Sequence, residues 1–111
     1  MVRIGTVVIN VTDARRAAEF WGQALGYTPR SEGSLTLVPK DGDGPGVNLD
    51  ETDRMHLDLS VADAAEQQAE VDRLIALGAK RVDWQYPEGA DFVVLADTED
   101  NLFCVVIVGQ G

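Results

Sequence analysis

Hydrophobic and polar residues along the first half of the chain predict a strand, a helix and three further strands. An apolar, β-branched run covers residues 4–11. Residues 14–25, before a helix-ending glycine, Gly26, form a helical pattern whose predicted apolar stripe, at i, i+3 and i+4 spacing, consists of Ala17, Phe20, Trp21, Ala24 and Leu25. These patterns are typical of a strand and an amphipathic helix. Further strand-like segments, separated by turn-forming sequences, follow at 27–30, 34–38 and 47–51.

The second half repeats this order. Residues 55–61 alternate apolar and polar side chains, which is the period of a strand whose two faces differ. A helical pattern over 64–77 ends at Gly78, just as the helical pattern of the first half ends at Gly26. Its predicted apolar stripe consists of Ala65, Ala69, Leu74 and Leu77, supported by Val71 and Ile75. The remaining strand-like segments lie at 80–84, 91–96 and 102–108.

The repetition predicts an internal duplication. We expect one α+β domain over residues 1–111, built from tandem βαβββ units at 1–53 and 54–111. Because one such unit leaves a sheet face bare, two units are expected to share a cupped, mostly antiparallel sheet with the helices on its outer face. The length of 111 residues agrees with one domain.

The charge balance narrows the choice of partners. The chain has 19 acidic and 9 basic residues and a net charge of -10, which argues against nucleic-acid binding and permits a cationic ligand. No apolar run approaches the ~20 residues of a spanning helix, and the N-terminus has no signal-peptide pattern. We therefore expect a cytoplasmic protein that does not bind a membrane.

Polar residues at alternate positions mark a candidate ligand site. His56, Asp58 and Ser60 share one face of their strand, and Thr6 and Asn10 are expected on the matching face of the first strand. Polar groups on an otherwise apolar face orient a small molecule, and Asp58 can tune His56 for acid or base catalysis. The alternative also stays open: these polar side chains hydrogen-bond only to one another or to water and bind no ligand.

Two aromatic residues form a second candidate feature. Trp84 and Tyr86 are two residues apart and share a strand face, so they can stack on a flat ligand. Contacts in the core or in a dimer explain them equally well. Cys104, the single cysteine, lies in an apolar strand-like run, where a reduced and buried thiol is expected.

The order and spacing of several segments resemble the vicinal oxygen chelate superfamily of glyoxalases, bleomycin resistance proteins and dioxygenases, and in particular its small glyoxalase-like domains. The segments are Val8 to Val11 with Asp13, Glu19 to Tyr27, Met55 to Leu59, Glu70 to Ala79, and Asp97 to Cys104. The resemblance implies a homodimer with a ligand cavity on the concave face of the sheet. In metal-dependent members it also implies four ligand positions.

The resemblance places those ligand positions at Thr6, near Asn48 or Asp50, at His56 and at Cys104. Threonine is a poor substitute for an imidazole ligand, and only His56 matches the pattern. We therefore expect no metal cofactor. If a divalent metal binds, His56, Asp50 and Cys104 are its candidate ligands.

The leading hypothesis is a metal-independent binding protein that sequesters an aromatic or cationic natural product, as bleomycin-resistance and other antibiotic-resistance members do. The alternative is an enzyme, either a lyase, an isomerase or a dioxygenase, that uses His56 with or without a divalent metal; a dimerising domain without a ligand is a third interpretation. The candidate ligand-binding residues are Thr6, Asn10, Asn48, His56, Asp58, Ser60, Trp84, Tyr86 and Cys104.

Overall fold

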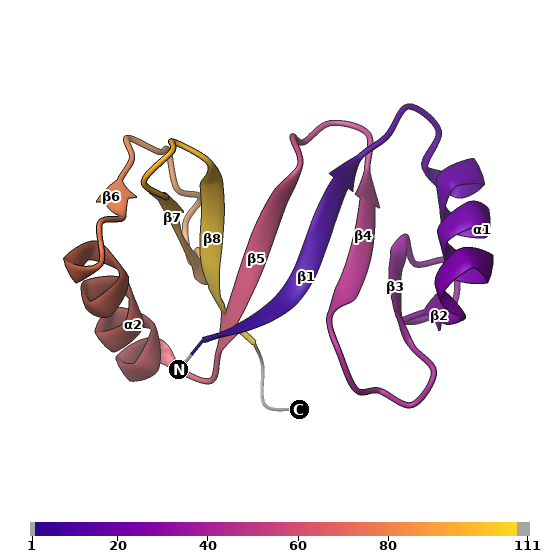
Figure 1. Ribbon diagram of the computed structural model, residues 1–111, viewed down its shortest axis with the longest axis horizontal. Coiled ribbons are helices and arrows are strands. Elements are labelled where there is room, and N and C mark those ends of the chain that lie inside the picture. Colours follow the sequence, from indigo (N-terminus) through magenta and orange to yellow (C-terminus); the bar gives the residue numbers. More distant parts are fainter. Residues whose placement is uncertain (1, 109–111) are drawn as a thin grey trace. The chain divides into compact units, whose positions relative to one another are not determined.

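The helices and strands follow the predicted order in both halves of the chain (Figure 1). The structure, a computed structural model, describes residues 2–108. It divides into an N-terminal unit, Gly5–His56, and a C-terminal unit that comprises Leu57 and the residues after it together with Ile4 and the residues before it. The predicted α+β class and the tandem βαβββ order are confirmed.

The elements of the first repeat form a four-stranded sheet with one helix. They are β1 (Arg3–Asn10), α1 (Ala14–Leu25), β2 (Tyr27–Pro29), β3 (Thr36–Pro39) and β4 (Gly46–Asp50). The strand order is β2-β3-β4-β1, in which β1 and β4 are parallel and the other neighbours are antiparallel. The second repeat has the same design.

The elements of the second repeat are β5 (His56–Val61), α2 (Ala64–Ala76), β6 (Lys80–Arg81), β7 (Phe92–Ala96) and β8 (Leu102–Ile107). Their order is β5-β8-β7-β6, with β5 and β8 parallel. The predicted strand over 80–84 is wrong beyond Arg81. Farther along β7, the Tyr86 hydroxyl accepts the Val94 N–H at 2.8 Å, so a side chain takes the place of a backbone partner there.

One helix packs on one face of each sheet. On α1, the residues against the core of the N-terminal unit are Ala14, Ala17, Ala18 and Trp21. On α2, Val71, Leu74 and Ile75 contact the core of the C-terminal unit. The predicted apolar stripes are wrong in part: their members Phe20, Leu25 and Leu77 are exposed. The buried stripe of α1 lies a few positions nearer its N-terminus than predicted.

The strand registers leave the polar candidates on the faces that the helices do not cover. Leu49 and Val47 of β4 join the core beneath α1, so their neighbour Asn48 faces away from that helix. In the C-terminal unit, Val105 and Val61 lie beneath α2. Cys104, next to Val105, is therefore on the helix-free face.

Within residues 2–108, no helix is both long enough and apolar enough to cross a membrane.

Candidate functional site

The strand pair β5–β8 brings three chemically active side chains together. Asp58 pairs with Cys104 across the two strands, and His56 precedes Asp58 by one strand period on the same face of β5. One potential ligand atom from each of these three residues lies within 4.8 Å of the others. All three residues are half-buried, so the cluster is sheltered but not closed off.

His56 is held by a backbone carbonyl at the start of β5. Its Nδ1 lies 2.8 Å from the carbonyl oxygen of Arg54. A carbonyl oxygen can only accept a hydrogen bond, so Nδ1 donates its proton to it. The His56 side chain is only 11% exposed, which limits the positions that the ring can adopt.

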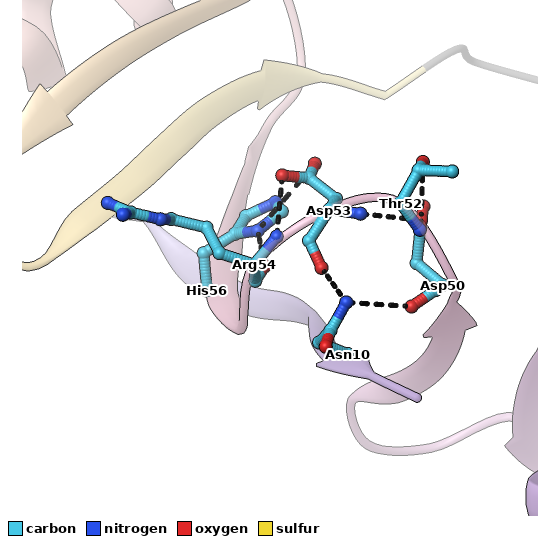
Figure 2. Close-up of polar contacts among 6 residues, drawn as sticks. All are labelled: Asn10, Asp50, Thr52, Asp53, Arg54 and His56. Carbon is cyan, nitrogen blue, oxygen red and sulfur yellow. Dashed lines mark hydrogen bonds and ion pairs between the residues drawn. The ribbon is translucent and has the colours of Figure 1, made fainter. Parts of the chain in front are cut away.

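A hydrogen-bonded turn between β4 and β5 positions this carbonyl (Figure 2). Asn10, at the end of β1, donates from Nδ2 to the carbonyl oxygens of Asp53 at 2.6 Å and of Asp50 at 3.4 Å. The Asp53 Oδ1 atom accepts the Arg54 N–H at 2.9 Å, and Asp53 Oδ2 lies 4.0 Å from His56 Nδ1. The turn thus links the end of β1 to the first residue of β5.

Asp50 closes the turn from its other side. Its Oδ1 atom accepts the Thr52 N–H at 2.8 Å, the Thr52 hydroxyl at 3.0 Å and the Asp53 N–H at 2.9 Å. These bonds, led by the Thr52 N–H, hold the pKa of Asp50 below its usual value, and the charge of His56 adds a smaller contribution. Asp50 is therefore an ionised capping group of the turn.

The donor set of the cluster fits a borderline divalent ion such as Zn²⁺. Imidazole nitrogen, carboxylate oxygen and thiolate sulfur are all common zinc ligands, and catalytic zinc sites use three protein ligands. A histidine that donates its other ring N–H to a carbonyl is also the usual arrangement around a metal. The residues that would hold such an ion are His56, Asp58 and Cys104. The ion would supply Lewis-acid chemistry.

A family model described as a glyoxalase-like domain matches residues 6–106 of the chain. The chain belongs to the glyoxalase-like domain family. The resemblance to small glyoxalase-like domains that was drawn from the sequence is thereby confirmed. No sequence among curated proteins matches the chain.

Three solved structures illustrate the range of proteins with this fold. An NAD-dependent benzaldehyde dehydrogenase from Legionella pneumophila is 15% identical with a TM-score of 0.66, and the alignment covers 93% of this chain and 97% of that chain. A variant of methylmalonyl-CoA epimerase from Streptomyces coelicolor, in complex with 2-nitronate-propionyl-CoA, is 15% identical with a TM-score of 0.61 and coverages of 100% and 99%. A glyoxalase/bleomycin resistance protein/dioxygenase superfamily member from Vibrio splendidus is 12% identical with a TM-score of 0.56 and coverages of 97% and 100%. At these identities the likeness concerns the fold, which does not fix the activity.

The other predicted site residues of the glyoxalase-like domain lie in varied surroundings. Asn48 donates from Nδ2 to the Thr36 hydroxyl at 2.8 Å, and Thr6 faces the same side of β1 and β4 as Asn48. Tyr86 is tied to β7 through its hydroxyl, and its ring lies 5.5 Å from that of Phe92. The remaining candidates are Ser60, which follows Asp58 on β5, and Trp84, which is 42% exposed.

Two parts of the site were missed in the sequence. Asp50 was paired with His56 as a metal ligand, whereas the cluster contains Asp58 and Asp50 accepts hydrogen bonds within its own turn. The role of the Arg54 carbonyl could not be predicted from the sequence, because every residue has a backbone carbonyl. The turn itself could have been predicted from Asp50, because an aspartate side chain readily accepts the backbone N–H two residues later and forms an Asx turn.

Proposed function

We propose that this glyoxalase-like domain is a small-molecule-binding protein that holds an aromatic or cationic ligand against the helix-free face of β5 and β8 without a resident metal. The observation that supports this proposal is the cluster of His56, Asp58 and Cys104 within 4.8 Å. A few convergent polar groups on an otherwise apolar face are the usual composition of a ligand site. Sequestration of a natural product, as in bleomycin resistance, is the role we assign to it.

The preference for a cation follows from charge. Asp58 supplies a carboxylate to the cluster. A carboxylate accepts charge-assisted hydrogen bonds, so a ligand with an ammonium or other cationic N–H donor pairs with it. The net charge of -10 raises the local concentration of cations around the whole chain.

Metal independence rests on the first strand. The resemblance calls for a ligand at Thr6, and a threonine hydroxyl binds transition metals weakly in comparison with imidazole. Homodimerisation, a cytoplasmic location and stacking by the exposed Trp84 are further parts of the proposal. Loss of ligand-induced fluorescence quenching in Trp84→Phe is the result expected if this side chain stacks on the ligand.

Calorimetric titration with two matched aromatic probes tests the proposal. EDTA-treated protein is expected to bind 2-naphthylmethylammonium saturably and to bind 2-naphthoate at least roughly tenfold more weakly, a difference of ~1.4 kcal/mol. Asp58→Asn keeps the side-chain shape and removes the charge, so it should weaken binding of the cation by about tenfold and should not weaken binding of 2-naphthoate. Equal binding of both probes, or binding only after a metal is restored, would contradict the proposal.

The same cluster favours a second candidate, a metal-dependent small-molecule enzyme. The three donor types within 4.8 Å suit Zn²⁺, as described above. Metal analysis of protein purified without chelators separates the candidates. A stoichiometric divalent ion that is lost in both His56→Ala and Cys104→Ser would support the enzyme and sink the metal-free proposal.

A further inference from the structure

An exposed aromatic side chain and a groove lie next to each other on α1. Phe20 is 62% exposed, and its ring meets the ring of Trp21 edge to edge-on face at a centroid distance of 5.1 Å. A groove of about 620 Å³ extends from Phe20 toward the start of the helix, and its apolar lining is completed by Val11, Ala17 and Trp21. The N-terminal unit therefore carries a projecting ring and an apolar groove on one surface.

Arg16 also lines this groove, one helical turn before Phe20 on the same side of α1. Within residues 2–108, its guanidinium group has no ion-pair partner. A basic side chain in the first turn of a helix is unfavourable, because the helix dipole is positive there. The helix itself therefore gives no reason for an arginine at this position.

The second helix has different residues at these positions. Counted from the capping aspartate of each helix, Arg16 corresponds to Glu66, and Phe20 corresponds to Glu70. Glu66 lies in the first turn of α2, where an acidic side chain suits the dipole. The shared architecture therefore requires neither an arginine nor an exposed phenylalanine on α1.

We propose that this surface of α1 binds the same surface of a second copy of the chain, with Phe20 of each copy in the groove of the other and Arg16 over the incoming ring. The inference rests on the homodimerisation that is part of the proposed function, and it names the interface. In a two-fold dimer each contact occurs twice, so a ring and a groove side by side on one helix can fill each other. The two helices run antiparallel, because parallel helices would place both rings at one height instead of offset toward the grooves. A cation over an aromatic face is attractive, which gives Arg16 a role.

The charge of this surface favours a second copy as its occupant. Asp13, Arg15, Arg16 and Glu19 balance one another at the start of α1, whereas the whole chain has a net charge of -10. Two copies repel each other through that net charge, and the repulsion is weakest where the local charge is zero. Added salt should therefore strengthen the dimer, because it screens the remaining repulsion.

Sedimentation equilibrium of the full chain tests the inference. The wild type should show a monomer–dimer equilibrium in the micromolar range, because one helix from each copy makes a small interface. Phe20→Ala should raise the dissociation constant at least about 100-fold, since each lost contact counts twice. Arg16→Gln removes only the cation and should raise it roughly 5- to 30-fold.

Two variants are matched controls. Leu77→Ala truncates an apolar side chain of α2 that is 68% exposed, and Arg30→Gln removes an exposed cation of the N-terminal unit that does not line the groove. Both should dimerise like the wild type. Circular dichroism checks that each variant folds. If Phe20→Ala does not fold, Phe20→Leu replaces it and should weaken the dimer by a smaller factor.

Isotope-filtered NMR of a mixture of labelled and unlabelled chains checks the geometry. It should show contacts between the Phe20 ring of one copy and the methyl groups of Val11 and Ala17 of the other. Dimers without these contacts would overturn the inference.

The outcomes separate the inference from the proposed function. A dimer that persists unchanged in both Phe20→Ala and Arg16→Gln overturns the inference and leaves homodimerisation in place. A wild type that stays monomeric up to millimolar chain overturns both, whereas binding of 2-naphthylmethylammonium is measured independently. If the dimer is lost in Phe20→Ala but the wild type does not bind the probe, the proposed ligand binding fails and the interface stands.

Discussion

The two repeats begin their helices in different ways. In the second repeat, the Asp63 carboxylate accepts the Glu66 N–H at 2.8 Å, and the Glu66 carboxylate accepts the Ala62 N–H at 2.8 Å. Both N–H groups are therefore capped by side chains from the start of the same helix. In the first repeat, Asp13 accepts the Arg16 N–H at 3.1 Å, but Arg16 stands where a glutamate would complete a capping box. The Ala14 N–H is satisfied instead by Glu51 at 2.9 Å, from the turn after β4.

This difference couples the first helix to the candidate site. Glu51 lies between Asp50 and Thr52, in the same turn that positions His56. The turn therefore holds both the start of α1 and the histidine of the candidate site, whereas the start of α2 is capped without any residue of that site. Duplicated units with one architecture can thus divide stability and function unequally.

The largest expected effect is the loss of stability when a core leucine is truncated, and it should be similar in both repeats. Leu37 and Leu95 are 1% and 0% exposed, one in each core. Leu37→Ala and Leu95→Ala should each lower the free energy of unfolding by about 2–5 kcal/mol, since each leaves a cavity in a packed core. Urea denaturation measures both. A loss below ~1 kcal/mol in either variant would show that its core is loosely packed.

The caps should distinguish the repeats. Glu51→Ala and Glu66→Ala are each expected to cost about 0.5–2 kcal/mol, because each leaves an N–H at a helix start without its carboxylate. Only Glu51→Ala should also change the NMR signals of the His56 ring, since Glu51 shares the turn with Asp50. If Glu66→Ala changes those signals equally, or Glu51→Ala leaves them unchanged, the proposed coupling is absent.

The smallest expected effects concern acid pH. The pKa of Asp50 is lowered chiefly by the Thr52 N–H, and that of Asp97 by the Asn101 N–H, from a usual value of 3.8. Because the folded-state pKa is depressed, the stabilisation is fully present above 3.8 and is lost as the pH falls through the lowered value. Carboxyl carbon NMR should show both groups titrating below 3.8. Of the two substitutions Asp50→Asn and Asp97→Asn, only Asp50→Asn should broaden or shift the NMR signals of the His56 ring.

A parallel acid effect is expected at Glu70, which is 6% exposed. Its carboxylate accepts the Arg73 Nε–H at 2.7 Å and the Val2 N–H at 2.6 Å, and these bonds, led by Arg73, lower its pKa. Stability from Glu70 is therefore also lost as the pH falls through its lowered pKa. Glu70→Gln should flatten this part of the curve of unfolding free energy against pH. An unchanged curve would assign the acid dependence to other carboxylates.

The sequence predicted those parts of the fold that local chemistry dictates. The start of α1 after Asp13 and its end at Gly26, where φ is 70°, follow from capping and from the freedom of glycine. The predicted strand beyond Arg81 failed because pairing with β7 stops there, which local propensity does not reveal. Phe20 was placed in the core by spacing, but packing selected Ala18 and left Phe20 62% exposed.

The candidate site was predictable along one strand and not between strands. Period-two alternation placed His56 and Asp58 on one face, because both lie on β5. The nearness of Cys104 depends on the register of β5 and β8, and the bond from Asn10 to Asp53 depends on a turn 43 residues away in the sequence. Spacing alone does not encode such contacts.

Mapping of a bound ligand tests the central claim most directly. Amide chemical shifts of metal-free protein are recorded during titration with 2-naphthylmethylammonium. We predict saturable changes centred on the helix-free face of β5 and β8, at His56, Asp58, Ser60 and Cys104, that are lost in Asp58→Asn. Saturable changes centred on α1 or α2, or no change in metal-free protein up to millimolar probe, would contradict the account.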